Sequence, residues 1–420
     1  MIYNILDFGA KTSDFLQTEK IQKAIDTCFL NGGGEVVIPT GVFKTGGLRL
    51  RSNVTLHLLS GAVLEGSENP EDYCGYINDT VEPLDVFKQG DLSRSVYHFS
   101  RWNNAIIRAI YAENIAIIGE PGSYIDGMNC YDELGEENFR GPHGINFREC
   151  KNITLNGYAI RRSANWAHNI FKSQNIEIKN VSVFGGHDGI DIFACDNVVI
   201  ENCELYTGDD CVAGFDNQNV TVKDCRMNCA CNAIRFGGTD VLIENCKIWS
   251  LSEFGHRWGL SDEDKKLKNP TNDKCNRHML SAFCYYCDSR INVRKTPGNI
   301  LMKNCEIKKV HTLFDNKFGE RWTCNCELES FKMENCNADE IDTAIEQRGE
   351  NGKTVIEFEN VGISFSDDAD KPCATVENFG KIIFKNVDIK NCNNPTIIKK
   401  SEIGEIMFDN TSSITVKDGE

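Results

Sequence analysis

Hydrophobic residues in the middle of the chain follow a repeat of about 22 positions. Residues 197–203 recur as 219–225, and a third copy, one residue early, spans 240–246. In each copy hydrophobic and polar residues alternate, which is the period of a β-strand, and Asn, Asp and Gly on either side indicate turns. A unit this short cannot bury a core alone, so we expect the copies to stack as coils of a parallel β-helix. The repeat predicts one inward-facing column: Val198, Val220 and Val241.

The same strand pattern extends toward both ends of the chain. Further copies lie at 34–39, 53–58, 114–119, 152–157, 299–307, 331–336, 355–361 and 382–387. Residues 17–32 instead have the period of an amphipathic helix, and we expect this helix to cap the open N-terminal end of the stack. Its hydrophobic face is predicted to consist of Ile21, Ala24, Ile25, Cys28 and Phe29. The prediction is an all-β fold, one domain over 1–420, with an N-terminal capping helix and an insertion loop over about 251–298.

Composition and charge narrow the possible partners. The chain has 420 residues, of which 40% are hydrophobic, so it can bury a large core. Its formal net charge of −17 argues against nucleic acid as a partner and against tight capture of a long polyanion. No stretch approaches 18 apolar residues and no signal peptide is visible, so we expect no membrane partner and a cytoplasmic location, with secretion only if a leader has been removed.

Twenty cysteines would ordinarily suggest a secreted protein. Many of them, however, fall at one position of the repeat, where they fit as small apolar fillers: Cys203, Cys225, Cys246, Cys305, Cys336 and Cys392. Thiols stacked in this way stay reduced in a reducing compartment. We therefore expect free thiols and not a disulfide framework.

Acidic residues also recur at the repeat period. Stacking places residues one period apart on adjacent coils, about 4.8 Å from each other. Two columns with a spacing of 22 follow, the first of Trp166, Asp188, Asp210 and Asn232, the second of Asn165, His187, Asp209 and Cys231. Stacked carboxyl groups repel one another, and this crowding raises at least one pKa toward the range of a catalytic acid. We expect Asp188, Asp209 and Asp210 to be catalytic; solvated turn residues are the structural alternative.

A possible zinc motif lies in the interrupted stretch. Four potential ligands fall within 13 residues: Cys275, His278, Cys284 and Cys287. This spacing suits a structural zinc site, although a chain with so many cysteines produces such clusters without a metal. We otherwise expect no metal and no cofactor.

Motifs around the acids resemble the polygalacturonase type of glycoside hydrolase, family 28. Thr207-Gly208-Asp209-Asp210 matches the paired aspartates of the family, and Asp188 falls where the family has Asn-Thr-Asp. Residues 34–41, 61–64, 125–127 and 141–168 are also similar to family segments. The resemblance implies a right-handed parallel β-helix that hydrolyses pectin-type, galacturonate-containing oligosaccharides with inversion. Asp209 would protonate the leaving oxygen while Asp188 and Asp210 activate water, for which inverting sites leave about 6.5–9.5 Å between carboxyl groups.

The chain departs from the family at the positions that bind substrate. Asn232 stands where the family has the histidine of Gly-His-Gly. The Arg-x-Lys that contacts the substrate carboxylate in the family has no clear counterpart, and Arg257 or the pair Arg294 and Lys295 are candidates. Arg235, three residues after Asn232, is a further candidate contact. The sequence therefore leaves open whether the substrate carries a carboxylate.

Four more residues near the acids are candidate sugar contacts. His187 and His168 could bind hydroxyl groups or be interior histidines, Trp166 could stack on a sugar or belong to the core, and Asp191 could support the acids or a turn. We expect an oligosaccharide substrate and exo action on short fragments, with the oligomeric state open. Two rival functions remain: a polysaccharide lyase whose aspartates hold Ca²⁺, and a carbohydrate-binding β-helix without activity.

Overall fold

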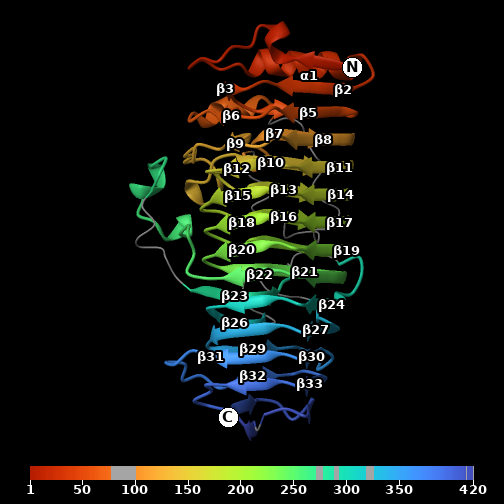
Figure 1. The fold of residues 1–420 in the computed structure, drawn as a ribbon, viewed down its shortest axis with the longest axis vertical. Helices are drawn as coiled ribbons and strands as arrows, with labels where there is room; N and C mark the ends of the chain where they lie inside the picture. The colour runs from red at the N-terminus through yellow and green to blue at the C-terminus, as the bar shows by residue number, and fades with distance from the viewer. Residues whose placement is uncertain (77–100, 271–277, 288–292, 318–325, 413, 420) are drawn as a thin grey trace.

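The protein is a right-handed parallel β-helix, seen from the side in Figure 1. The computed structural model describes residues 1–76, 101–270, 278–287, 293–317, 326–412 and 414–419. Its strands pair in parallel from coil to coil, from β1 (Ile2–Asn4) at one end to β37 (Thr415–Asp418) at the other. The fold predicted from the 22-residue repeat is confirmed.

The strands form three faces around the core. One face is a 12-stranded sheet that runs from β3 (Gly41–Thr45) to β34 (Asp388–Lys390). The other two join into a 25-stranded sheet, because the long strands β19 (Val212–Lys223) and β21 (Asn232–Glu244) bend across both. β19 pairs first with β16 (Ile190–Phe193) and then with β17 (Asp196–Glu201).

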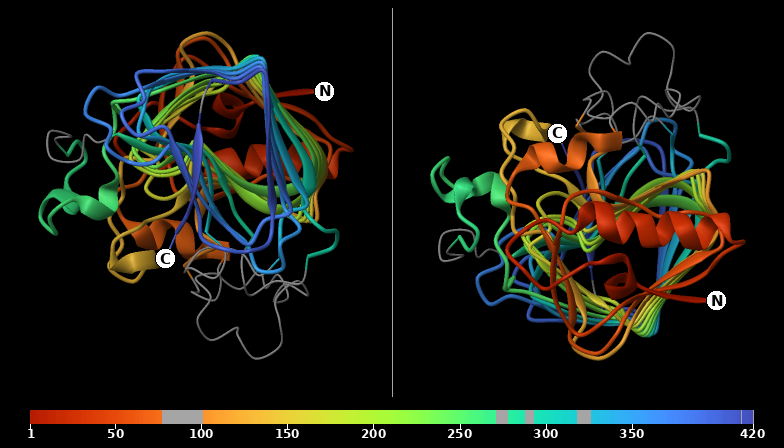
Figure 2. Two further views of the ribbon diagram at one scale, coloured as in Figure 1. Left: turned by 90° about the horizontal axis from the view of Figure 1, so that it is seen from below. Right: turned by 90° about the horizontal axis from the view of Figure 1, so that it is seen from above.

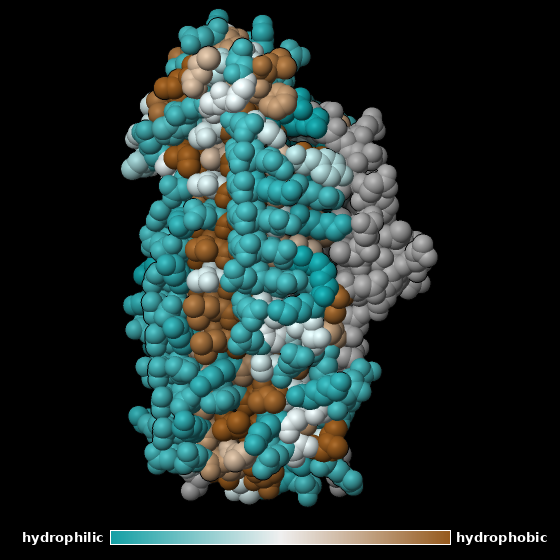
Figure 3. Space-filling model, turned by 90° about the vertical axis from the view of Figure 1, so that its right-hand side faces the viewer, coloured by the Kyte–Doolittle hydropathy of each residue, from teal (hydrophilic) through white to brown (hydrophobic). Residues whose placement is uncertain are grey.

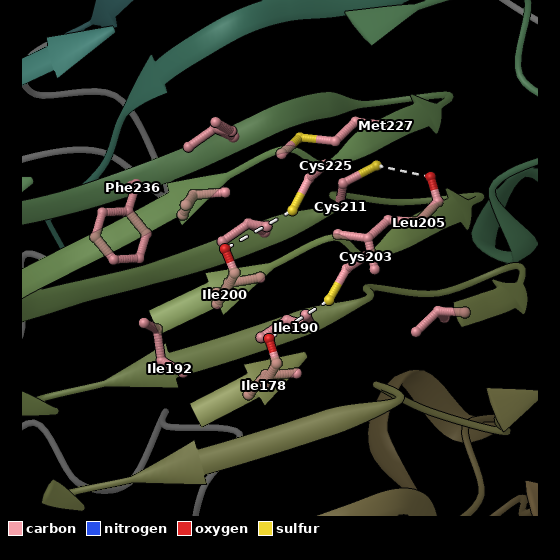
Figure 4. Close-up of a cluster of buried hydrophobic side chains, with 14 of the residues drawn as sticks. Ile178, Ile190, Ile192, Ile200, Cys203, Leu205, Cys211, Cys225, Met227 and Phe236 are labelled. Carbon is pink, nitrogen blue, oxygen red and sulfur yellow. Dashed lines mark hydrogen bonds between the residues drawn. The ribbon is translucent and has the colours of Figure 1, made fainter. Parts of the chain in front are cut away.

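Inward-facing residues stack from coil to coil as the repeat predicts. Val198, Val220 and Val241 are direct partners in the registers of β17, β19 and β21, and all three are buried. Figure 4 shows the adjoining thiols among isoleucines, where Cys203 Sγ lies 3.6 Å from the Ile178 carbonyl oxygen. The thiols therefore act as small buried fillers with a weak donor.

One cysteine was misplaced in the predicted column. The registers that follow Cys336 bring Val361 and then Val387 to the equivalent position, and Cys392 lies five residues further along. The error arose because the residues before Cys392 repeat the Asn-Cys ending of the true copies.

The predicted N-terminal helix is α1 (Thr18–Leu30), which lies across one end of the stack in Figure 2. Four of the five predicted face residues are buried: Ile21, Ala24, Ile25 and Cys28. Phe29 is instead 40% exposed, with the Arg51 guanidinium 5.6 Å from its ring centre. Gln22 exchanges two hydrogen bonds with the backbone of Arg49 in β4 (Leu48–Arg49), so the helix satisfies polar groups near the open end. In the described part of the chain no helix is both long and apolar enough to span a membrane.

Asparagines form a ladder along the outside of the stack, at the starts of β8 (Glu113–Gly119), β11 (Lys151–Asn156), β14 (Gln174–Lys179) and β17. Asn152 Nδ2 donates to Asn114 at 2.9 Å, Asn175 to Asn152 at 2.9 Å and Asn197 to Asn175 at 3.1 Å. Each has a positive φ of 55–57°, a conformation that Asn tolerates better than most residues. The side of the molecule in Figure 3 shows hydrophilic side chains in rows along the stack. The turn residues lie at the other end of each copy, where Asn202 Nδ2 donates to Asn180 at 2.7 Å and Asn245 Nδ2 donates to Asp224 at 3.1 Å.

The interruption predicted over about 251–298 is only partly outside the β-helix. β23 (Met279–Tyr285) pairs in parallel with β21 and with β26 (Val310–Lys317), so the chain returns to the stack within this stretch. The sequence did not reveal this strand because its buried residues follow one another without strict alternation. The preceding segment, green in Figure 1, projects from the stack and contains η6 (Arg257–Gly259) and η7 (Asp264–Lys266).

Candidate active site

The three predicted acids lie where the chain leaves the 12-stranded sheet. Asp188 follows β15 (Ser182–Gly185), and Asp209 and Asp210 follow β18 (Glu204–Thr207). The backbone amide of Asp210 donates to Asp188 Oδ1 at 2.9 Å. The amide and Nδ2 of Asn232 donate to Asp210 Oδ1 at 2.9 and 2.8 Å. Each carboxyl group of the predicted column is therefore held by the next coil.

The carboxyl groups are closer together than expected. One oxygen from each of Asp188, Asp209 and Asp210 lies within 4.8 Å of the other two, whereas inverting sites usually leave about 6.5–9.5 Å between carboxyl groups. Burial raises the pKa of Asp188 well above its ordinary value, and the neighbouring carboxylates raise it further. Burial also raises the pKa of Asp210, although the nearby Arg235 opposes this. The carboxyl groups therefore titrate together and tend to share a proton.

Asp209 has a different electrostatic environment. His256 Nε2 lies 2.8 Å from Asp209 Oδ2, and Arg140 Nη2 lies 3.6 Å from the same oxygen. Burial opposes ionisation of Asp209, but His256 and the cations outweigh burial and hold the pKa of this carboxyl well below its usual range. The Trp258 amide donates to His256 Nδ1 at 3.0 Å, so Nε2 carries the proton donated to Asp209. In the free protein the negative charge rests on Asp209.

Glycines allow the projecting segment to reach Asp209. A Cβ on Gly208 would lie 2.3 Å from the Gly255 carbonyl oxygen and 2.7 Å from Gly186 Cα. Both acid-bearing turns thus lack side chains where residues 253–257 cross them. This close approach is what places His256 against Asp209.

His256 and Arg140 were not predicted as site residues. Arg140 Nε also lies 2.8 Å from Glu137 and 3.9 Å from Glu136, so its charge is shared among three carboxylates. Neither residue belongs to a β-helix repeat, so the column argument could not find them. The one available signal was Asn232, because it left the histidine position of the resembled family unfilled.

Two predicted histidines have different surroundings. His168 is fully buried and lies 3.0 Å from both the Tyr158 hydroxyl and the Gly189 carbonyl oxygen, and burial lowers its pKa to about 4. It is an interior residue and not a substrate contact. His187 is also buried, stacks on Phe139 with ring centres 6.0 Å apart, and has no hydrogen bond at either ring nitrogen within the described ranges. It stays a candidate ligand-binding residue.

Trp166 and Asp191 are both buried. Trp166 packs against Trp102 and Phe193 with ring centres 4.8 and 5.5 Å apart, so the prediction of a sugar-stacking platform is wrong and the core alternative holds. Asp191 is fully buried, and neither of its oxygens has a hydrogen-bond partner among the residues described. Burial raises its pKa well above the ordinary value, against the attraction of Arg235.

Arg235 lies directly beside the acids, as predicted. Its Nε is 2.7 Å from Asp210 Oδ2, an ion pair in which the N–H does not point at the oxygen. Its guanidinium lies 4.3 Å from the ring centre of Tyr286. Arg235 Nε, the ring of His187 and the carboxyl of Asp191 are thus all buried polar groups without aligned partners. Such groups are rare in native proteins and gather where a ligand or water completes the hydrogen bonding.

The other predicted cations do not reach the acids. Arg257 is buried and its Nη1 donates to Asn129 Oδ1 at 3.0 Å, so it anchors the projecting segment. Arg294 Nε pairs with Asp216 Oδ2 at 2.9 Å, six residues further along the chain than Asp210. Lys295 pairs on the outside of the same region, with 53% of its side chain exposed. The prediction of a substrate contact is wrong for Arg257, because its side chain is buried, and it stays a prediction for Arg294 and Lys295.

The predicted zinc motif is not assembled in the part that the structure covers. Cys275 lies outside the described residues, and the ligand atoms of His278, Cys284 and Cys287 do not form a group within 4.8 Å. His278 instead stacks on His311 with ring centres 5.5 Å apart.

A cation is also disfavoured at the acids. Asp209, Cys231 and His256 lie within 4.8 Å of one another, but Nε2 of His256 carries a proton and Arg140 adds positive charge. Asp188 and Asp210 each accept hydrogen bonds from backbone amides, and Asp210 also faces Arg235. This arrangement does not suit the Ca²⁺ site that a lyase would need.

Comparison with known proteins agrees with the resemblance read from the motifs. Residues 89–233 match the model of glycosyl hydrolases family 28. A segment of 73 residues is 51% identical to an exo-poly-alpha-D-galacturonosidase of Dickeya chrysanthemi, over 17% of this chain and only 12% of that protein. The fold is similar to a hyperthermoactive exopolygalacturonase of Thermotoga maritima, with TM-score 0.65 and 18% identity over 93% of this chain and 92% of the other. It is also similar to a family 28 exopolygalacturonase of Yersinia enterocolitica, with TM-score 0.60 and 19% identity over 99% and 78%.

Proposed function

We propose that this chain, which carries a family 28 segment over 89–233, is an exo-acting, inverting hydrolase of pectin-type oligosaccharides that contain galacturonate. One observation carries the proposal. Three carboxyl groups on adjacent coils are fixed within 4.8 Å, and their environments push their pKa values apart. Carboxyl groups tuned in opposite directions are the arrangement that acid and base catalysis of glycoside hydrolysis requires. The relative from Dickeya supports galacturonate as the sugar.

In this mechanism the acids divide proton donation and water activation. Asp188 and Asp210 keep one oxygen each on a backbone amide, which fixes them to hold a water molecule. Their raised pKa values suit a base, since a base works best near the operating pH. Asp209 donates to the leaving oxygen, as the resemblance implies. Asp209 is ionised in the free protein. The proton shared by the carboxyl groups must therefore pass to Asp209 when substrate enters the site.

The direct test is hydrolysis of trigalacturonate. We expect new reducing ends, release of single galacturonate residues from one chain end, and no ultraviolet-absorbing unsaturated product. Asp188→Asn and Asp210→Asn should abolish release while leaving the fold intact. Unsaturated product would support the lyase alternative, and binding without any new reducing end would support a carbohydrate-binding protein.

We also propose a cytoplasmic location, on the basis of the cysteines. None of the 18 cysteines within the described residues is in a disulfide, and most are buried. Such thiols suit a reducing compartment. Thiol counting on protein denatured without reductant tests this, since mostly paired cysteines would contradict it.

A further inference from the structure

We propose that Lys371 binds the carboxylate of a uronate unit of the substrate, in the cavity that adjoins the acids and several coils beyond them. The inference rests on the proposed function and adds to it the residue that would select a charged substrate. A cavity of about 350 Å³ adjoins the acid column, with Asn232 and Arg235 in its wall. Both of these residues contact Asp210, so the cavity opens beside the proposed reacting atoms.

The far wall of this cavity comes from later coils. Thr312, Asp315 and Lys317 lie on β26, and Lys371 lies on the connection between β31 (Gly362–Phe365) and β32 (Ala374–Glu377). In the β-strand register, Arg235 is followed on the next two coils by Cys284 and Asp315. The cavity therefore runs along the stack away from Asp210, over the coils of β23 and β26.

Among the described residues that line the cavity, one cation has no ion pair. Arg235 pairs with Asp210 at 2.7 Å, and Lys317 pairs with Asp315 at 3.0 Å. Lys371 forms no ion pair with any residue that the structure describes, although its charge acts on the nearby Glu346. A lysine that lines a cavity and forms no ion pair within the described residues can receive an anion there.

A carboxylate is the anion that fits this position. The ammonium group is a compact charge with three donors, which a sugar carboxylate matches. Asn232 and Thr312, in the wall of the same cavity, carry groups that can hydrogen-bond to sugar hydroxyls. A phosphate or sulfate group would bring more charge close to the ionised Asp209 and Asp315. The proposal therefore names a uronate sugar and not another acidic ligand.

The test compares charged and neutral forms of one substrate. Binding of trigalacturonate and of its methyl ester is measured by calorimetry on the Asp209→Asn protein, with and without Lys371→Met. We expect Lys371→Met to weaken binding of the acid by at least about 10-fold, to leave the ester unchanged, and to be restored by Lys371→Arg. Lys390→Met is the matched control, because Lys390 is exposed on the 12-stranded sheet, away from the acids.

The outcomes separate this inference from the proposed hydrolysis. Equal loss for acid and ester, or no loss for either, would overturn the role of Lys371. If the unmodified protein releases no reducing ends but Lys371→Met still weakens only the acid, the hydrolase proposal fails while the carboxylate subsite is supported.

Discussion

The backbone amide of Asp210 donates a hydrogen bond of 2.9 Å to Oδ1 of Asp188, so one acid is positioned by the coil that carries the other. This bond follows from the 22-residue spacing, because residues one period apart become neighbours when coils stack. The relative position of these two acids is therefore a property of the repeat itself.

The first prediction distinguishes the proton donor from the residues that activate water. Asp209→Asn should lower kcat by about 10²–10⁴-fold, the usual contribution of general acid catalysis. The loss should shrink on an aryl galacturonide, because a good leaving group needs little protonation, whereas Asp188→Asn and Asp210→Asn should not be rescued. Steady-state kinetics on both substrates measures this. Rescue of Asp188→Asn instead would assign the acid to Asp188.

The second prediction concerns the close approach at Gly208. Gly208→Ala puts a Cβ 2.3 Å from the Gly255 carbonyl oxygen and should displace the segment that carries His256. We expect at least about a 10-fold loss of kcat with little change in substrate binding, since a displaced catalytic contact costs rate. Gly185→Ala is the matched control, because its Cβ would meet nothing closer than 3.7 Å. Equal activity of the two variants would show that the position of His256 does not matter.

The third prediction uses the pKa of Asp188. The raised folded pKa means that Asp188 gains a proton as the pH falls through a value above about 4, the ordinary pKa of an aspartate. Water activation needs the ionised form, so kcat/KM should fall below that pH. Asp191→Asn removes one of the charges that raise this pKa and should move the acid limb to lower pH. If the acid limb of the pH profile does not shift, Asp191 does not raise the pKa of Asp188.

The raised pKa of Asp191 also affects the stability of the folded protein. A carboxyl group with a raised folded pKa destabilises the folded protein above its unfolded pKa, and this cost disappears as the pH falls. Asp191→Asn should therefore raise the melting temperature at neutral pH and have less effect near pH 4.

The fourth prediction tests the stacked core. Phe314 packs against Phe283 and Phe331, with ring centres 6.1 and 4.6 Å away. Phe314→Ala should reduce the free energy of unfolding by about 3–5 kcal/mol, the usual cost of removing a buried aromatic ring. Phe15→Ala, at a site 81% exposed, should change it by less than about 0.5 kcal/mol. Denaturant titration that finds similar values for both would contradict the packing described.

The sequence predicted what depends on the repeat and missed what does not. The coils, the inward valines and the column of Asp188, Asp210 and Asn232 all follow from a fixed spacing between adjacent coils. His256 reaches Asp209 over 47 positions through an irregular segment, and no period connects them.

The errors among the predicted cations have a related cause. A motif shows which residue types lie near the acids in the sequence. It does not show which partners their long side chains contact. Arg257 and Arg294 point to Asn129 and Asp216, and not to the three acids. Lys371 was not predicted because it lies far along the chain and enters the cavity only through stacking.

The configuration of the first product tests the proposed mechanism most directly. The acids lie within 4.8 Å of one another, which is shorter than is usual for inversion. The configuration of the product, and not this distance, must therefore distinguish inversion from retention. Proton NMR of trigalacturonate hydrolysis, recorded before the product mutarotates, should show the β-anomer appearing first from the α-linked substrate. The α-anomer as the first product would mean retention through a covalent intermediate, and would contradict the roles given to Asp188 and Asp210.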